Sequence, residues 1–473
     1  MESMVDFASN DNVDRQLLGE FERTVLAILP SNASFAEREQ LALRLANELV
    51  RRHLQNWLQQ MAQAQPTQIV LDDVLYRRHQ PGQVAYNSLC GPLWVNRWTY
   101  RPVGVRNGPT RVPLELAAGL IESATPQLAK YVAQGYAKAP IRSVEQDLHA
   151  AHRLPPSRCT LERMALAIGT QVKKVAQRLE HQVRVDEVVP DHAVAINLGL
   201  DRTSIPMAED GPVRPASVTD TPKAASRHRQ RVLRYRMGYV GTVTLTDAEG
   251  ETLVTRRYAA PAHVGPDRIL ERMMADLRLV REQKPELRIA VVQDGAPELW
   301  TLMGDALRAE LKLGPRAVAW HEIIDRYHLM QHLAQGLELV VPKYPARVRK
   351  LEQWRQELDQ NDRAIVSIHR WLDRVARKRK RWDKMNQVVG RYICILRRFR
   401  YASAKKRGLH QGSGVTEGAC KTLITKRTKR SGQRWRPRGI SAVLALRSLL
   451  ESDRLDRFWP LFAARYQKLP LAA

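Results

Sequence analysis

Residues 192–201 read HAVAINLGLD, an apolar run with the composition of a buried strand that ends in an acid. A second run of this kind, LRIAVVQD, occupies residues 287–294 and also ends in an acid. Between them, YRMGYVGTVTLTD (235–247) and ETLVTRRYA (251–259) alternate like two antiparallel strands joined by a tight turn. These four segments predict the centre of a sheet, with one acid at the end of its first strand and another at the end of its fourth.

The elements that follow complete an α/β pattern. Residues 266–284 and 297–311 have helical patterns, and AVAWHEIID (317–325) is a further short strand. Three strands followed by helix, strand, helix and strand are compatible with a ribonuclease-H-like mixed sheet. The ends of the first and fourth strands lie side by side in such a sheet, so Asp201 and Asp294 are expected to be neighbours.

The flanking sequence is mainly helical. Ser34 and Glu37 form a capping box before the apolar positions of a helix that include Leu49 and Leu58. The run RVARKRKR (374–381) has six basic residues in eight and is either a solvated helix face or a phosphate-binding surface. The expected organisation is an N-terminal helical region (1–69), a small β-hairpin unit (70–125), helix-turn-helix-like helices (126–189), the first part of the core (190–328), a basic all-α insertion (329–407) and the rest of the core with its C-terminal helices (408–473).

The helices of 126–189 allow two interpretations. They could be a helix-turn-helix that reads DNA, which would make the N-terminal region a DNA-binding one, or an ordinary helical hairpin. Spacing alone leaves both open. In the basic insertion, an apolar stripe that includes Trp371, Trp382, Val389 and Leu396 is expected to form the core.

Composition and charge indicate the class of partner. The chain has 473 residues, too many for a single core, and 44% of them are hydrophobic, as in folded proteins. Lys and Arg number 76 against 49 Asp and Glu, which gives a net charge of +27. Because self-repulsion at this charge destabilises a compact chain, a polyanionic partner is expected, with nucleic acid as the leading candidate. The alternative is a basic protein without such a partner.

Cysteine spacing and hydropathy exclude other classes. Cys90, Cys159, Cys394 and Cys420 lie far apart, which excludes a disulfide framework and a Cys-rich zinc site. The N-terminus is polar and acidic, unlike a signal peptide, and no apolar run approaches the ~18 residues of a membrane span. We therefore expect a cytoplasmic, nucleoid-associated protein without a membrane partner.

Three acids are candidates for metal chemistry. Asp201 and Asp294 end predicted strands, and Glu417 opens a helix after the long helical segment. Three converging carboxylates repel one another unless a cation lies between them, and Mg²⁺ prefers such oxygen ligands. Singly, each acid also has a structural explanation: Asp294 could cap the next helix, Glu417 could complement a helix dipole, and Asp201 could pair with an arginine.

Other polar residues could assist these acids. Asp325 and His328 would share one helix face after the fifth strand, either as a structural contact or as a pair that positions DNA near the metals. Beyond Glu417, a basic helix offers cations that would hold phosphates, and Trp435 could stack on an unpaired base or pack in the core. The candidate DNA-contacting residues of this helix are Lys421, Lys426, Arg427, Lys429, Arg430, Arg434 and Trp435.

Four motifs together resemble one known family. They are LGLDRTSIPM (198–207), VVQDG (291–295) followed by Trp300, DRYH (325–328), and GSGVTEGACKTLITKRTKRSGQRW (412–435). Over residues 190–450 the chain resembles the DDE transposases of bacterial insertion sequences, particularly the Kra group. The resemblance implies that the two catalytic aspartates of this family correspond to Asp201 and Asp294 and its glutamate to Glu417. The Asp-x-x-His signature of related superfamilies corresponds to Asp325 and His328.

The spacing of the acids is similar to one subclass of this family. Asp201 and Asp294 are 93 residues apart, and Asp294 and Glu417 are 123 residues apart. The long second gap is typical of transposases that insert an all-α domain before the Glu-bearing helix. The resemblance implies two Mg²⁺ ions, for which Mn²⁺ substitutes, hydrolysis at transposon ends, and attack of the freed 3′-OH on target DNA.

The expected function is therefore DNA transposition on double-stranded transposon ends and target DNA, by a homodimer or larger assembly. Two alternatives remain open at the level of sequence. One is a nuclease of the same fold that cuts without joining. The other is a captured DNA-binding protein that has lost the chemistry.

Overall fold

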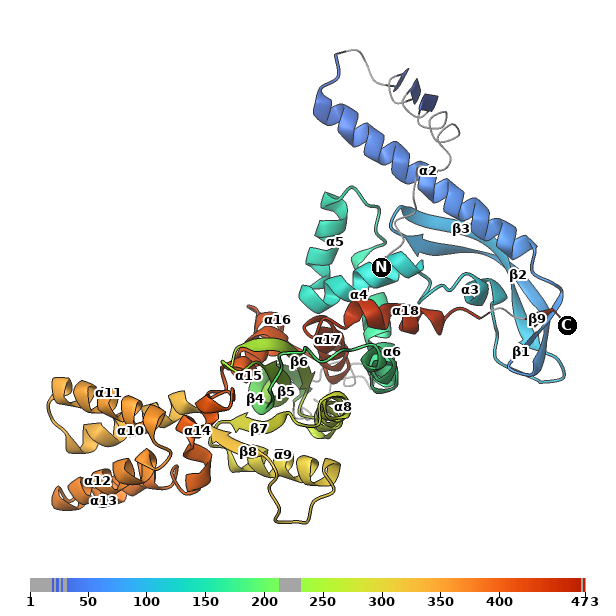
Figure 1. The fold of residues 1–473 in the computed structure, drawn as a ribbon. Helices are drawn as coiled ribbons and strands as arrows, with labels where there is room; N and C mark the ends of the chain where they lie inside the picture. The colour runs from blue at the N-terminus through green and yellow to red at the C-terminus, as the bar shows by residue number, and fades with distance from the viewer. Residues whose placement is uncertain are drawn as a thin grey trace, which may run out of the picture. The chain divides into compact units, whose positions relative to one another are not determined.

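The computed structural model describes residues 32–211 and 231–468, together with residues 19–20, 23–24, 27–28 and 471–472. The chain forms two compact units, Met1–Ile168 with Leu461–Ala473, and Gly169–Pro460 (Figure 1). The start of the expected N-terminal helical region, residues 1–18, lies outside the described residues. Within the described part of the chain, no helix combines the length and apolar character that crossing a bilayer requires.

The first unit combines a long helix with a four-stranded sheet. Helix α2 (Phe35–Gln63) begins at the predicted capping box, which is confirmed because the side chain of Ser34 and that of Glu37 each bond the other's backbone N–H. Of the expected apolar stripe on this helix, Leu58 is buried and Leu49 is 61% exposed, and the other positions are partly buried. The sheet has the order β3-β2-β1-β9, with β1 (Gln68–Leu71), β2 (Val74–Ser88), β3 (Gly91–Pro102) and β9 (Leu471–Ala472).

Side chains of α2 close the free edge of this sheet. The Oε1 atom of Gln55 accepts from the backbone N–H of Trp94 at 3.0 Å, and Oε1 of Gln59 accepts from that of Asn96 at 2.9 Å. The amide nitrogen of Gln59 returns a bond to the Asn96 carbonyl at 3.1 Å. Two glutamines one helical turn apart thus take the place of a neighbouring strand along β3.

Four helices follow the hairpin. They are α3 (Pro113–Ala117), α4 (Pro126–Lys138), α5 (Ile141–Ala150) and α6 (Arg158–Val185). Helices α4 and α5 pack so closely that a Cβ at Gly135 would lie 2.9 Å from the Val144 side chain. The expected succession of helices is therefore present, and its DNA-reading role stays a prediction.

The second unit is built on a five-stranded mixed sheet of order β6-β5-β4-β7-β8. Strands β4 (Ala195–Asp210), β5 (Arg231–Thr246) and β6 (Thr252–Ala260) are antiparallel, and β7 (Arg288–Gln293) and β8 (His321–Ile324) run parallel to β4. The first and fourth strands of this unit are therefore neighbours, as predicted. Helices α8 (Asp267–Gln283) and α9 (Pro297–Glu310) connect β6 to β7 and β7 to β8.

Strand β4 is longer than the sequence suggests. It pairs with β7 only over Ala195–Leu198, but its pairing with β5 continues to Asp210. The prediction that the first strand ends at Asp201 is therefore wrong. Asp201 lies inside β4, three residues beyond the last pair with β7, because β5 still supplies hydrogen bonds there after β7 has stopped.

The two faces of the β4–β5 pair carry different helices. A Cβ at Gly241 would lie 2.5 Å from Ile269 of α8, whereas a Cβ at Gly199 would lie 2.0 Å from the hydroxyl of Thr416 in α15 (Gly414–Ala419). Gly199 and Asp201 are two residues apart in one strand, so their side chains point to the same face. Asp201 therefore faces the helix that bears Glu417.

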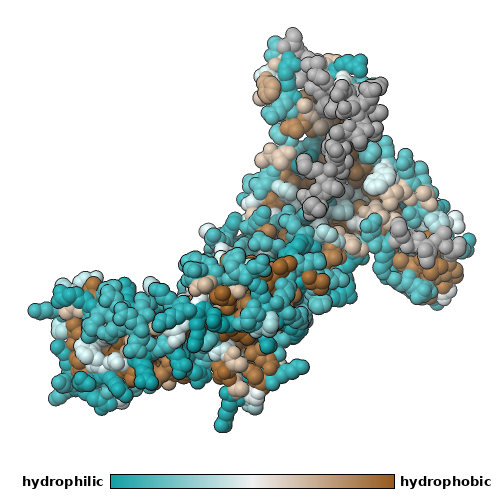
Figure 2. All heavy atoms as spheres, viewed as in Figure 1, coloured by the Kyte–Doolittle hydropathy of each residue, from teal (hydrophilic) through white to brown (hydrophobic). Residues whose placement is uncertain are grey.

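A helical region separates β8 from that helix. It contains α10 (Arg326–Val340), α11 (Tyr344–Gln360), α12 (Ala364–Lys378), α13 (Trp382–Met385), the π-helical segment η2 (Asn386–Gly390), the short 3₁₀ helix η3 (Leu396–Phe399) and α14 (Tyr401–Lys406). Val389 of the predicted stripe is fully buried, but Leu396 is 47% exposed and Trp382 lies at the surface. The basic residues of 374–381 are all exposed, and Figure 2 shows mainly hydrophilic side chains over this region.

A buried ionic network ties α6 and the last helices to the core of the second unit. Arg454 precedes α18 (Leu455–Ala464), and its guanidinium bonds Glu187 at 2.6 Å and Asp276 of α8 at 2.8 Å. Arg184 of α6 bonds the same Asp276 oxygen at 2.6 Å. Asp276 is 3% exposed and its pKa is lowered by these two arginines against the effect of burial, which raises it.

Candidate functional site

Asp201 lies within electrostatic reach of both Asp294 and Glu417. Burial raises the pKa of Asp201, and the charges of Asp294 and Glu417 raise it further. The backbone N–H of Arg202 and the thiol of Cys420, 3.3 Å from Oδ2, donate to Asp201 and partly oppose this shift. Asp201 therefore senses the charges of both Asp294 and Glu417, and the role of the three acids as one catalytic set stays a prediction.

Each acid is positioned by a different element. Asp294 follows β7 directly, and its Oδ1 accepts from the N–H of Ala296 at 2.9 Å. Ala296 is the N-cap residue of α9 and no side chain caps this helix, so the capping role that the sequence allowed for Asp294 is wrong. Glu417 stands on α15, and this helix continues through the π-helical segment η4 (Cys420–Thr425) into α16 (Lys426–Thr428). Such π segments interrupt α-helices frequently at functional sites.

The approach of α15 to the sheet depends on a glycine. Thr416 Oγ1 lies 2.8 Å from Thr242 Oγ1 across the backbone of Gly199, where no Cβ fits. Thr416 is 3% exposed and Thr242 is 2% exposed, so this hydroxyl pair is isolated from solvent. The contact between these two hydroxyls determines how closely α15, which carries Glu417, approaches β4.

Asp325 has a structural role beyond the predicted pairing with His328. It is 2% exposed, it is the N-cap residue of α10, and its Oδ1 accepts from the backbone N–H of His328 at 2.8 Å. Its Oδ2 accepts from both the N–H and the hydroxyl of Ser413, which precedes α15. Asp325 therefore joins the start of the helical region to the turn that carries Glu417.

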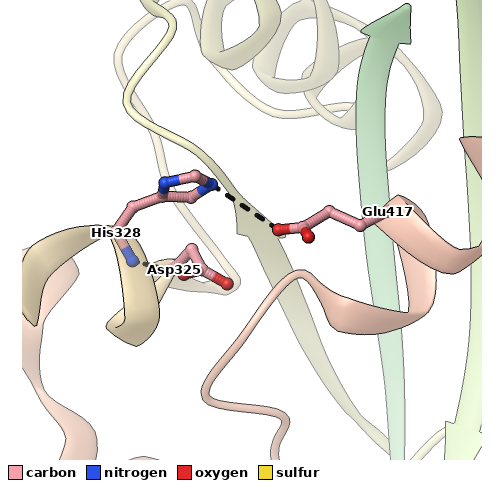
Figure 3. A group of neighbouring side chains, drawn as sticks. All are labelled: Asp325, His328 and Glu417. Carbon is pink, nitrogen blue, oxygen red and sulfur yellow. Dashed lines mark hydrogen bonds and ion pairs between the residues drawn. The ribbon is translucent and has the colours of Figure 1, made fainter. Parts of the chain in front are cut away.

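The imidazole of His328 points at Glu417. Its Nε2 lies 3.5 Å from Oε1 of Glu417, as Figure 3 shows. Asp325, His328 and Glu417 each offer a ligand atom, and these atoms all lie within 4.8 Å of one another, so the group could hold a metal ion. The sequence left Asp325 and His328 as either a structural contact or a pair that positions DNA, and their proximity to Glu417 adds the possibility of metal binding.

The sequence led us to expect a divalent cation, and the described residues whose ligand atoms gather closely enough for one are Asp325, His328 and Glu417, without Asp201 or Asp294. Burial is the main cause of the raised pKa of Asp201, and the charges of Asp294 and Glu417 add to it. A cation beside Asp201 would offset both effects. Asp201, Asp294 and Glu417 offer oxygen donors alone, a set that suits Mg²⁺ and Mn²⁺ alike.

Most of the predicted cations are accessible. Lys421, Lys426, Lys429 and Arg430 are exposed on and just after η4 and α16, and Arg434 follows them in an exposed position. Lys429 extends along β4, where its Nζ donates to Thr203 Oγ1 at 3.2 Å. These positions suit contacts with a polyanion.

Arg427 and Trp435 are inside the protein, contrary to the DNA-contacting role predicted for them. Arg427 is 1% exposed and its guanidinium lies 4.8 Å from the ring centre of Trp435, which is 7% exposed. The indole Nε1 donates to the Thr428 carbonyl at 3.1 Å, and the Trp435 backbone bonds Pro206 and Ala208 of β4. Arg427 and Trp435 pack the end of the helix that carries Glu417 against β4. This is the alternative in which Trp435 packs in the core.

Sequence reasoning missed three residues of the site, Ser413, Cys420 and Tyr392. Ser413 and Cys420 stand four residues before and three after Glu417, a spacing that places them near its face. Tyr392 comes from the helical region, and its buried hydroxyl has no hydrogen-bond partner in the described part of the chain. Burial raises the pKa of Tyr392, and the charges of Asp325 and Asp294 raise it further. Local sequence carries no signal for Tyr392.

Comparison with known proteins does not assign the chain to a family: no family model matches it, and no curated protein is significantly similar to it.

Proposed function

We propose that this chain is a DNA transposase of the DDE class with a ribonuclease-H-like core. It would cut at transposon ends and join the freed 3′-OH to target DNA. The observation that carries the proposal is the sheet order β6-β5-β4-β7-β8: it makes β7, which Asp294 follows, the neighbour of β4, and Asp201 of β4 senses the charges of both Asp294 and Glu417. The net charge of +27 supports a nucleic-acid substrate.

In this proposal the acids bind metal, the exposed cations bind DNA, and Asp325 positions Glu417. Asp201, Asp294 and Glu417 would hold two Mg²⁺ or Mn²⁺ ions, which supply an activated oxygen nucleophile and stabilise the leaving oxygen. The exposed cations after Glu417, among them Lys429 and Arg430, would hold the phosphate backbone without reading sequence. Asp325 would fix the turn before α15 through Ser413 and so orient Glu417.

A transposase holds two DNA ends together, so we also propose a homodimer or larger assembly on DNA. Light scattering of the protein with end-containing duplexes tests this part. Complexes with one protein chain alone would remove it and leave the chemistry untouched.

The chemistry is tested with labelled duplexes that span both flanks of the gene, with and without Mg²⁺. Three variants remove one carboxylate each: Asp201→Asn, Asp294→Asn and Glu417→Gln. Asp305→Asn on α9, whose side chain is 66% exposed, is the matched control. DNA binding is measured separately by fluorescence anisotropy, so that a loss of cutting is not confused with a loss of affinity.

The expected result is metal-dependent cutting at defined ends, followed by joined products, which the three variants abolish and the control retains. Cutting without joined products would instead establish a nuclease of the same fold. Binding without cutting by the wild-type protein would overturn the catalytic proposal and favour a captured DNA-binding protein.

A further inference from the structure

We propose that Asp325, His328 and Glu417 form a second cation subsite that differs from the first in having a nitrogen ligand. This subsite would take a first-row transition-metal ion such as Mn²⁺ in preference to Mg²⁺. The inference deepens the proposed function and rests on it, because Glu417 would be common to both subsites. Of the two ions in the proposed function, this inference gives the second to Asp325, His328 and Glu417, and Asp201 and Asp294 would join Glu417 in holding the first through oxygen donors alone.

The geometry is close to that of a bound ion. The three ligand atoms lie within 4.8 Å of one another, and bonds of about 2.0–2.2 Å at tetrahedral angles place two ligands of one metal about 3.3–3.6 Å apart. Nε2 of His328 and Oε1 of Glu417 already have this separation at 3.5 Å, and both side chains are partly exposed, so they can move toward Asp325. Asp325 is buried and accepts from the backbone N–H groups of His328 and Ser413, so it is the ligand with the most fixed position.

The Ser413 hydroxyl has too few protons to donate to both carboxylates that it contacts. The Ser413 hydroxyl lies 2.9 Å from Oδ2 of Asp325 and 2.9 Å from Oε1 of Glu417, but it has only one proton to donate. One of these two oxygen–oxygen contacts therefore lacks a hydrogen. A cation beside the two carboxylates removes this conflict.

The contact between His328 and Glu417 also lacks a proton when His328 is neutral and carries its proton on Nδ1. The Nδ1 atom of His328 lies 3.2 Å from Oε1 of Gln331, and donation of the Nδ1 proton to that oxygen leaves a lone pair on Nε2. This lone pair faces Oε1 of Glu417 at 3.5 Å, where two acceptors meet. A metal ion between them would accept both, with Gln331 fixing the tautomer from behind, as partners of metal-bound histidines do. Protonation of His328 is the competing way to satisfy the contact.

The nitrogen ligand determines which ions are preferred. Mg²⁺ is bound through oxygen and keeps much of its water, whereas imidazole is a common ligand of first-row transition metals. Tyr392 provides an additional polar group near this subsite. Its buried hydroxyl has no partner among the described residues, and burial and the charges of Asp325 and Asp294 raise its pKa. The two subsites would therefore differ in selectivity although they share a carboxylate.

The test uses the full-length protein without DNA, with Mn²⁺ as the probe. Electron paramagnetic resonance counts the bound ions, and its pulsed form detects an imidazole ¹⁴N bound to Mn²⁺. His328→Gln removes the nitrogen ligand, and His328→Glu replaces it with oxygen. His181→Gln, at an exposed position of α6, is the matched control. Thermal melts check that each variant is folded.

We expect two Mn²⁺ ions in the wild-type protein, one of them with a ¹⁴N signal that excess Mg²⁺ leaves in place. His328→Gln should lose the nitrogen signal and lower the affinity for that ion at least about tenfold. His328→Glu should keep a second ion but let Mg²⁺ displace it. Asp201→Asn should retain the nitrogen signal. A wild-type protein without the signal, or a signal that survives in His328→Gln, would overturn the inference in favour of a protonated His328.

Metal binding and DNA chemistry fail independently. A protein that binds Mn²⁺ through His328 but never cuts DNA would refute the transposase proposal and leave the subsite intact. A protein that cuts and joins DNA without a nitrogen-bound ion would do the reverse.

Discussion

Gly199→Ala is expected to separate the position of Glu417 from its chemistry. The new Cβ would lie 2.0 Å from Thr416 Oγ1, and Cβ atoms are essentially never found closer than 3.0 Å to such a neighbour. Helix α15 must therefore retreat from β4 by about 1 Å, and a misplacement of that size costs on the order of 10²-fold in rate. Overpacking of this kind destabilises a protein by about 1–3 kcal/mol, so the fold should survive.

Strand cutting by the purified variant measures the first effect, and urea unfolding measures the second. Gly314→Ala, where a Cβ meets nothing within 4 Å, is the control and should match the wild type. Adding Thr416→Ala to Gly199→Ala removes the nearest atom and should restore part of the lost rate. Activity within about twofold of wild type in the single variant would refute the argument that this contact sets the position of Glu417.

Three further predictions concern charge. Asp201→Asn should stabilise the metal-free protein at neutral pH by ~1.4 kcal/mol for each unit by which folding raises the pKa of Asp201. Because the raised pKa favours the protonated acid, wild-type stability should fall as pH rises from near 4 through that pKa, and thermal melts of the variant should lack this component. Arg454→Met leaves Glu187 and Asp276 short of a buried partner and should cost about 3–5 kcal/mol in urea unfolding; a loss below about 1 kcal/mol would contradict the network's role. Replacing Lys429 and Arg430 by alanine should weaken DNA binding equally for all sequences and reduce the salt dependence of log K by about 0.9 for each lost phosphate contact, as anisotropy titrations in KCl would show; sequence-dependent loss would point to base reading instead.

The sheet could be predicted because each of its central strands has a recognisable local sequence pattern. Apolar runs that end in Asp201 and Asp294, with an alternating pair between them, were sufficient for the order and direction of the central strands. The length of β4 was not predictable, because residues beyond Asp201 owe their strand conformation to pairing with β5, a contact with distant sequence.

The site was predictable in its acids but not in the contacts that position them. Asp325 and His328 were expected to pair with each other, whereas each reaches separately to the Glu417 segment. Arg427 is a cation in a basic run, and nothing local distinguishes it from its exposed neighbours. Its burial depends on Trp435, which the backbone of β4 holds in place, so only the tertiary structure reveals it.

The amide bonds from Gln55 and Gln59 to β3 have a consequence for how the chain can be shortened. Without α2, the part of β3 that includes Leu93, Val95 and the largely exposed Trp94 would lose the bonds that satisfy the backbone groups of Trp94 and Asn96 at its outer edge. Such an edge recruits strands from other molecules and leads to aggregation. A fragment that begins after residue 64 would thus be expected to collect in inclusion bodies, and hydrophilic substitutions elsewhere on its surface would not rescue it.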